Sequence, residues 1–207
     1  ELTKHNLSVT ECTLRENPPT PAKANSNLET APVNEYLEQA DFFQQAGNTE
    51  AAFAELERAL ELDPKNPRLI EALGSGLFQQ ERFEEARPHF RHLIELQPRN
   101  AMAYTRLAMT SYVTDRYDEF ESALGLAMEI DPELPEMLHF MGKVNLDQER
   151  YYDAGRIFSK LVELEPNNVQ NLLALAMCLY QGGQTEAAKD TYERALQMDP
   201  ENKIAWA

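Results

Sequence analysis

The chain has 207 residues, with 19 Lys or Arg against 35 Asp or Glu, so its formal net charge is −16 at pH 7. Hydrophobic side chains make up 43% of the sequence, which is enough to form a packed core. So acidic a surface repels phosphate groups, and we therefore expect neither nucleic acid nor an anionic membrane as a partner. The apolar runs are far shorter than the roughly 20 residues of a membrane-spanning helix, so we expect no membrane insertion.

Residues 1–32 follow no repeat. The proline- and asparagine-rich stretches at 17–21 and 24–27 are typical of a linker. The isolated apolar residues before them leave two alternatives open. The segment either packs as a cap over the structure that follows, or occupies the concave surface of its own or a neighbouring molecule. The second alternative predicts self-association through residues 1–32.

From residue 33 the sequence repeats every 34 residues. Each unit closes with a proline, and these prolines are Pro64, Pro98, Pro132, Pro166 and Pro200. Twelve residues before the proline there is an alanine in four of the five units, and eight residues before it there is always a larger apolar side chain. The five units span 33–66, 67–100, 101–134, 135–168 and 169–202, and residues 203–207 begin a sixth.

Each unit is predicted to form two helices. In the second unit, Ile70, Leu73 and Leu77 share one face of a helix, and Phe90 and Leu93 lie on the facing stripe of a second one. The closing proline ends the second helix because its ring cannot continue the hydrogen-bond ladder. One such hairpin cannot bury its apolar face alone, so the sequence predicts an all-α solenoid of stacked antiparallel helix pairs.

The small residues, the aromatic residue and the closing proline at period 34 resemble the tetratricopeptide repeat (TPR) family. The resemblance covers residues 33–202, and Trp206 stands where the family pattern places its tryptophan. It implies a right-handed superhelix whose inner, concave wall is lined by the first helix of each unit. Some family members clamp the C-terminal carboxylate of heat-shock chaperones. No window of three units carries their clamp residues, and starting from the first unit only Arg106 agrees.

The third unit departs from this pattern. Phe120 replaces the small residue, and Ser111 stands where three of the other units have Phe43, Leu77 or Leu179. We expect Phe120 to fill the space next to Ser111 and to alter the angle between the two helices. In the fourth unit, Asn145 is predicted to be a buried amide that needs hydrogen-bond partners.

The inner face of the first helices is the candidate binding site. If positions 4, 7, 8 and 11 of each unit pack inward, positions 2, 5, 9 and 12 face the groove. The predicted groove residues are Phe78, Met102, Thr105, Met109, Tyr112, His139, Lys143, Leu146, Leu173, Met177 and Tyr180. Exposed apolar surface of this extent marks an interaction site, and methionines suit adaptable binding. The alternative is that some of these residues pack against the next unit.

We find no catalytic constellation and expect no cofactor. His89 and His92 have the spacing of two metal ligands on one helix face, but no cysteine or third histidine lies near them in sequence. We therefore expect no metal site. The arginines between Arg82 and Arg106 form either a docking patch for an acidic partner or an ordinary solvated face.

These features predict a protein–protein interaction scaffold that binds a peptide or helical segment of a partner. One alternative is the recognition arm of an enzyme, for which the resemblance allows a glycosyltransferase, methyltransferase or sulfotransferase with its catalytic domain outside this sequence. Another is a secretion or assembly chaperone. The incomplete sixth unit indicates a piece of a longer protein. We expect a cytoplasmic location, with the periplasm as the alternative.

Overall fold

The computed structural model describes residues 30–200, with side chains described from residue 33 onward. Trp206 and residues 1–29 lie outside this part of the chain, so the predicted arrangements of residues 1–32 and self-association through them stay predictions. Within residues 30–200 the structure has ten helices and no strand, which confirms the all-α fold class. The helices are α1 (Thr30–Gln45), α2 (Thr49–Leu62), α3 (Pro67–Gln79), α4 (Phe83–Leu96), α5 (Ala101–Val113), α6 (Tyr117–Ile130), α7 (Pro135–Asp147), α8 (Tyr151–Leu164), α9 (Val169–Gln181) and α10 (Thr185–Met198).

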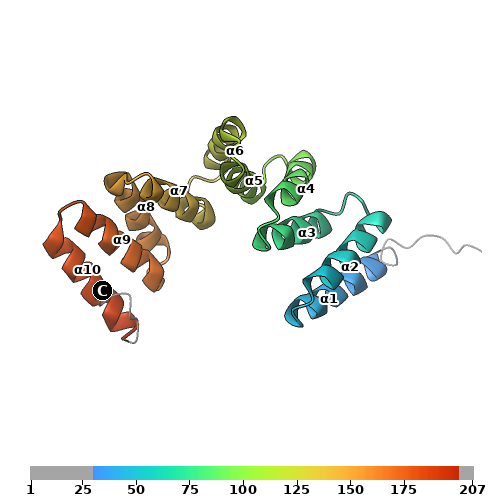
Figure 1. The fold of residues 1–207 in the computed structure, drawn as a ribbon, viewed down its shortest axis with the longest axis horizontal. Coiled ribbons are helices and arrows are strands. Elements are labelled where there is room, and N and C mark those ends of the chain that lie inside the picture. The colour runs from blue at the N-terminus through green and yellow to red at the C-terminus, as the bar shows by residue number, and fades with distance from the viewer. Residues whose placement is uncertain (1–29, 201–207) are drawn as a thin grey trace, which may run out of the picture.

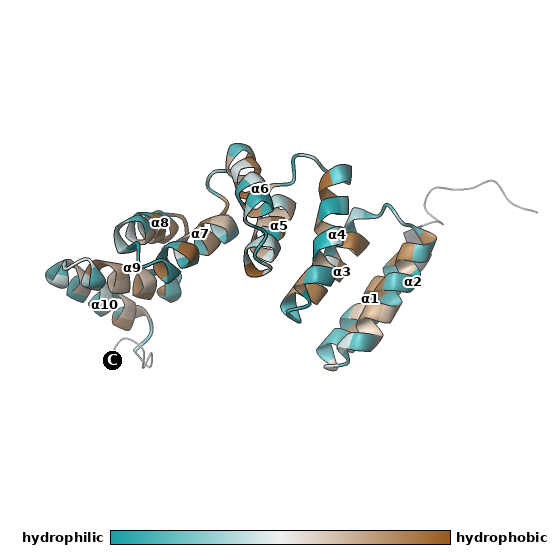
Figure 2. Cartoon of the chain, turned by 45° about the horizontal axis from the view of Figure 1, so that its top comes forward, coloured by the Kyte–Doolittle hydropathy of each residue, from teal (hydrophilic) through white to brown (hydrophobic). Residues whose placement is uncertain are grey.

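The helices form consecutive antiparallel pairs that follow one another along an arc (Figure 1). At the apex of this arc, α3 and α5 lie on the inner side, whereas α4 and α6 lie on the outer side. Every helix carries both hydrophobic and hydrophilic residues, as amphipathic helices do (Figure 2). Within residues 30–200, none is long and apolar enough to cross a membrane.

Local sequence signals account for where several helices begin. The side chains of Asn48, Asn66, Asn100 and Asn168 each accept a hydrogen bond from a backbone N–H in the first turn of α2, α3, α5 and α9. These contacts satisfy amide groups that have no partner inside the helix. Pro67 is the first residue of α3, where its missing N–H costs nothing.

The turn inside each helix pair has the same backbone geometry. Gly47 and Gly183 have φ angles of 74° and 77°, and Glu81, Asp115 and Glu149 have φ between 57° and 59°. All five residues occupy the same position of the 34-residue unit. The left-handed conformation is cheap for the two glycines and costs energy at the three acidic residues. The geometry of the turn is therefore kept even where the residue type does not favour it.

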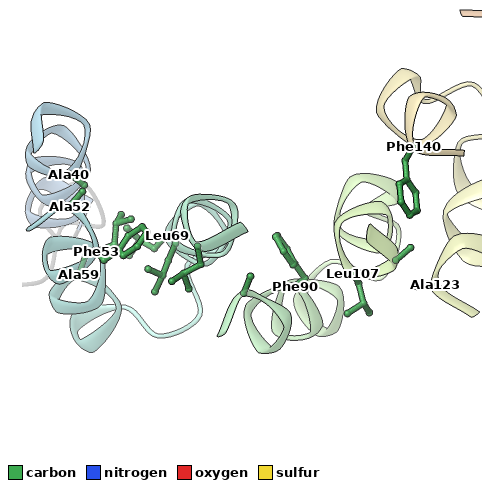
Figure 3. Packing of buried hydrophobic residues seen from close by; sticks show 14 of the residues in the cluster. Ala40, Ala52, Phe53, Ala59, Leu69, Phe90, Leu107, Ala123 and Phe140 are labelled. Atoms are coloured by element: carbon green, nitrogen blue, oxygen red, sulfur yellow. The ribbon is translucent and has the colours of Figure 1, made fainter. Parts of the chain in front are cut away.

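The core lies where the two helices of a pair meet and where neighbouring pairs stack (Figure 3). Small side chains allow the close approach, since Ala52, Ala86, Ala154 and Ala188 are all buried. Larger apolar residues such as Phe90 of α4 are buried too, and the Phe90 ring packs against Gly74 and Phe78 of α3. The buried residues form four clusters distributed along the arc rather than one centre.

The third pair differs from our expectation for Phe120 and Ser111. Ser111 is fully buried, and the side chain that meets it is Glu119, whose Oε2 accepts a hydrogen bond from the Ser111 hydroxyl at 2.8 Å. Phe120 packs elsewhere, with its ring 5.2 Å from that of Tyr112 and 5.9 Å from that of Phe140. A buried hydroxyl needs a polar partner, which an aromatic ring cannot supply.

Asn145 in the fourth pair is buried, as the sequence predicted. Its Nδ2 donates a hydrogen bond to the backbone carbonyl of Met141 at 2.8 Å. The partner that the amide needs is therefore the preceding turn of its own helix.

Candidate functional site

A groove of about 420 Å³ lies across α3, α5 and α7, the first helices of three consecutive pairs. We call it the central groove. Its lining consists of Phe78, Gln79, Glu81, Phe83, Arg106, Met109, Tyr112, Val113, Phe140, Lys143, Val144 and Asp147. Most of these side chains are apolar, and they come from three repeats, so the site exists only because the repeats stack.

Aromatic side chains hold each other in place within the central groove. The ring of Tyr112 lies 5.7 Å from that of Phe140 at an interplanar angle of 80°, and the ring of Phe78 lies 5.3 Å from that of Phe83 at 71°. Edge-to-face contacts of this kind favour a single arrangement of the rings. Phe140 is almost completely buried, whereas Phe78 and Tyr112 are partly exposed. The groove therefore has a rigid aromatic floor with accessible edges.

Two basic side chains line the central groove and differ in their surroundings. Nη2 of Arg106 lies 2.8 Å from Oε1 of Glu136, and its guanidinium carbon is 5.3 Å from the centre of the Phe78 ring. The charge of Arg106 is thus neutralised by Glu136, and its guanidinium group lies over the Phe78 ring. Lys143 is exposed and makes neither an ion pair nor a hydrogen bond with any residue that the structure describes.

The structure brings four of the predicted groove residues together. Phe78, Met109, Tyr112 and Lys143 all line the central groove. The other predicted residues lie elsewhere: Met102 and Leu146 are partly buried outside its lining, and Met177 and Tyr180 are exposed on α9. The apolar surface predicted for the C-terminal half is therefore separate from the central groove.

Thr105 and Leu173 do not reach the concave surface. Thr105 is fully buried and its hydroxyl donates a hydrogen bond to the Ala101 carbonyl at 2.9 Å, while Leu173 is 6% exposed. Both residues occupy position 5 of their units. We therefore correct the prediction that they line the groove.

His139, at the same position of the fourth unit, makes a polar contact with Glu165, the residue that ends α8 in its own helix pair. Its Nε2 lies 3.3 Å from Oε2 of Glu165, which also accepts hydrogen bonds from Asn168 and Asn171 at 2.9 Å. The hydrogen bonds from Asn168 and Asn171 hold the pKa of Glu165 below its usual value. His139 thus contributes to the junction between the fourth and fifth pairs.

Several residues of the central groove were not predicted from the sequence. Arg106 and Phe140 occupy position 6 of their units, Val144 position 10, and Val113 position 13. Each stands one position, or one 100° helical step, after an expected groove position, so the centre of the groove lies between the expected stripe and this one. The helical period predicts this stripe only when it is known which face of each helix packs inward.

The arginines on the outer side form ion pairs. Arg82 pairs with Glu50 and Glu85, Arg87 with Glu84 and Glu119, and Arg91 with Glu119. Burial lowers the pKa of His89, and the nearby charge of His92 lowers it further. Among the residues that the structure describes, no group of three or more His, Cys, Asp or Glu side chains is placed to hold a metal ion.

The stacked helix pairs and the groove along their first helices define this chain as an α-solenoid of helical repeats. Family models described as tetratricopeptide repeat match residues 33–76, 71–135 and 145–207. The chain belongs to the tetratricopeptide repeat family.

The chain is similar in sequence to several proteins over most of its length. The chain is 28% identical over 170 residues to the type IV pilus assembly protein PilF of Pseudomonas aeruginosa, covering 81% of this chain and 67% of that protein. It is 26% identical over 168 residues to Hsp70-Hsp90 organizing protein 1 of Glycine max, covering 78% of this chain but only 29% of that protein. The chain therefore spans less than a third of the length of the Glycine max relative.

Solved structures show the same fold. The structure of Pseudomonas aeruginosa PilF superposes with a TM-score of 0.71 at 24% identity, covering 86% of this chain and 81% of that one. YrrB, described as a TPR protein with an unusual peptide-binding site, superposes with a TM-score of 0.58 at 19% identity, covering 87% and 92% of the two chains. At these identities the likeness establishes the fold alone.

Proposed function

We propose that this chain is a protein-interaction scaffold whose central groove binds an apolar peptide segment of a partner. The observation that carries the proposal is the gathering of aromatic and aliphatic side chains from three repeats into one concave site. Ligand sites in proteins are concave and mostly apolar, with a few polar groups that orient the ligand. The central groove has this composition, with Arg106 and Lys143 as its basic groups.

The contacts within the groove favour a segment that inserts side chains. Tyr112 and Phe78 present accessible edges above a buried ring, and rigid aromatic residues of this kind carry much of the energy in protein interfaces. Met109 adds a flexible surface that adjusts to the inserted side chain. The names of the relatives, a chaperone-organizing protein and a protein with a peptide-binding site, are consistent with this use of the fold.

A panel of displayed random 12-residue peptides tests the proposal. Peptides selected on the wild-type protein are measured again on the double variant Tyr112→Ala, Met109→Ala. The matched control is Tyr152→Ala, Met198→Ala, which removes one exposed tyrosine and one exposed methionine from α8 and α10, outside the groove. We expect the groove variant to weaken binding at least about tenfold and the control to leave it unchanged.

Two results would contradict the proposal. One is the failure of the selection to enrich any peptide. The other is an equal loss of affinity in both double variants. Circular dichroism of each variant verifies that the helices remain folded, since Tyr112 also contacts neighbouring rings.

An assembly factor is the second candidate, favoured by the similarity to PilF over most of both chains. In this role the groove holds an apolar segment of a subunit until that segment is paired. Saturable capture of an unassembled subunit, followed by its release when the subunit's own partner is added, distinguishes this role from a permanent scaffold. The recognition arm of a larger enzyme concerns a domain outside this sequence and stays a prediction, as does the compartment.

A further inference from the structure

Of the two basic side chains that line the central groove, Lys143 is the one without an ion pair to the residues that the structure describes. It stands on α7 in the lining of the central groove, beside Val144 and in the same groove as Tyr112 and Phe140. Several basic residues with described side chains pair with an acid: Arg106 with Glu136, Lys160 with Glu133, and Arg91 with Glu119. Lys143 makes no such pair with the residues that the structure describes, although the full sequence has a formal net charge of −16.

An apolar ligand changes the energetics of this side chain. While the groove is open, water solvates the ammonium group of Lys143, which is exposed. A segment that covers the groove removes part of this water, and an uncompensated charge under an apolar ligand is costly. Arg106 does not need a ligand group in the same way, because Glu136 and the Phe78 ring already compensate its charge.

The acidic residues of the groove lie toward one end. Asp147 is one helical turn beyond Lys143 on α7, and Glu81 follows the end of α3. Neither carboxylate lies within ion-pair distance of Lys143, and both favour neutral or basic ligand groups at that end. The groove therefore offers an unpaired cation on α7 and two acids near the C-terminal ends of its helices.

We propose that Lys143 selects the ligand: the segment bound in the central groove carries an Asp or Glu among its apolar residues, and this carboxylate pairs with the Lys143 ammonium. The inference rests on the proposed function and specifies the chemistry of the partner. The ligand removes water from the Lys143 ammonium group, and the paired carboxylate offsets the cost of losing this water. A neutral apolar segment leaves the lysine without a partner and binds more weakly.

The test uses the same displayed library of random 12-residue peptides, selected separately on the wild type, Lys143→Met and Lys143→Glu. Methionine keeps the length and the apolar stem of the side chain and removes its charge. Wild-type selection is expected to enrich Asp or Glu at one position beside apolar residues, and Lys143→Met to lose this preference. Lys143→Glu is expected to replace it with Lys or Arg. Lys189→Met, an exposed lysine on α10 outside the groove, is the matched control and is expected to keep the wild-type preference.

A synthetic peptide from the wild-type selection and its acid-to-amide variant then complete a double-mutant cycle by fluorescence anisotropy. The amide is expected to cost about tenfold in affinity on the wild type and on Lys189→Met, but less than twofold on Lys143→Met. An equal cost on wild type and Lys143→Met overturns the inference, as does a selection without an acidic position. If those peptides still depend on Tyr112 and Met109, the proposed function stands and only the role of Lys143 fails. If the selection enriches no peptide, both fail.

Discussion

In the fourth helix pair, α7 and α8 approach closely at a glycine that faces an aromatic ring. A Cβ atom added to Gly142 of α7 would lie 2.7 Å and 2.9 Å from Cζ and Cε2 of Phe158 on α8. Such distances are shorter than any normal contact, and Phe158 is 4% exposed, so its ring has little space to move. Glycine is therefore required here by the approach of the two helices.

We predict that Gly142→Ala destabilises the protein by about 1–2 kcal/mol. Alanine gains up to about 1 kcal/mol of helix propensity, but overpacking a tight core costs about 1–3 kcal/mol and displaces the Phe158 ring. Urea unfolding followed by circular dichroism measures the change in the free energy of unfolding. Since both terms act on the same residue, the sign of the result shows which one is larger.

Gly125→Ala is the matched control for that measurement. Gly125 lies inside α6, and a Cβ atom placed there meets nothing within 4 Å. With no steric cost, alanine is expected to stabilise the protein by about 0.5–1 kcal/mol. If Gly142→Ala stabilises the protein as much as Gly125→Ala does, the contact with Phe158 does not limit the packing of α7 on α8.

At the scale of helices, Glu119 joins three elements through polar contacts. From α6 it accepts a hydrogen bond from Nε of Arg91 on α4 at 2.7 Å and from the hydroxyl of Ser111 on α5 at 2.8 Å. Arg87 of α4 adds an ion pair at 3.5 Å. Burial alone raises the pKa of Glu119, but the hydrogen bonds from Arg91 and Ser111 and the charges of both arginines outweigh it and lower the pKa.

The lowered pKa of Glu119 predicts how stability depends on pH. A carboxyl group whose pKa is lower in the folded state stabilises the protein above the unfolded pKa, and this contribution is lost as the pH falls through the folded pKa. We expect the wild type to exceed Glu119→Gln by about 1 kcal/mol in free energy of unfolding at pH 7. This difference should shrink as the pH falls below the ordinary value of 4.5.

Urea unfolding of both proteins between pH 7 and pH 3 measures that difference. Glu129→Gln is the control, because Glu129 is exposed on the same helix and forms no ion pair with the residues that the structure describes. A difference between wild type and Glu119→Gln that stays constant down to pH 3 would show that the charge of Glu119 does not contribute.

The sequence predicts the starts of helices well, but it does not predict the lining of the groove or the ion pairs between helices. The start of α3 at Asn66 and Pro67 follows from a cap and a proline, which act within one turn and are visible in the sequence. The groove depends on which face of each helix turns inward, so a rotation of about half a residue step buries Thr105 and brings Phe140 into the site. Ion pairs such as Arg91 with Glu119 join residues 28 apart and have no local signal.

At the scale of the whole molecule, two cavities lie at the junction between the third and fourth helix pairs. A cavity of about 680 Å³ separates Met128 of α6 from α7 and α8, and another of about 250 Å³ lies between α6 and α7. Phe140 crosses this junction from α7 toward α5 and α6 (Figure 3), with its ring 5.7 Å from that of Tyr112 and 5.9 Å from that of Phe120. These aromatic contacts join α7 to α5 and α6 of the third helix pair.

Phe140→Ala is predicted to uncouple α3–α6 from α7–α10. Because each repeat contacts only its neighbours, the cooperativity of a solenoid depends on every interface along it. Hydrogen exchange measured by mass spectrometry at increasing urea should show the two groups of helices losing protection together in the wild type and at different urea concentrations in Phe140→Ala. The substitution should also cost about 3–4 kcal/mol in free energy of unfolding, as expected for an aromatic residue that is 7% exposed.

Phe158→Ala provides the comparison that isolates coupling from the loss of core volume. Phe158 is 4% exposed and packs within the fourth pair, against Gly142, so its removal creates a similar cavity away from the junction. This variant should be destabilised to a similar degree while the two groups of helices still lose protection together. If both variants behave alike, the aromatic contacts of Phe140 contribute stability but do not carry the coupling along the arc.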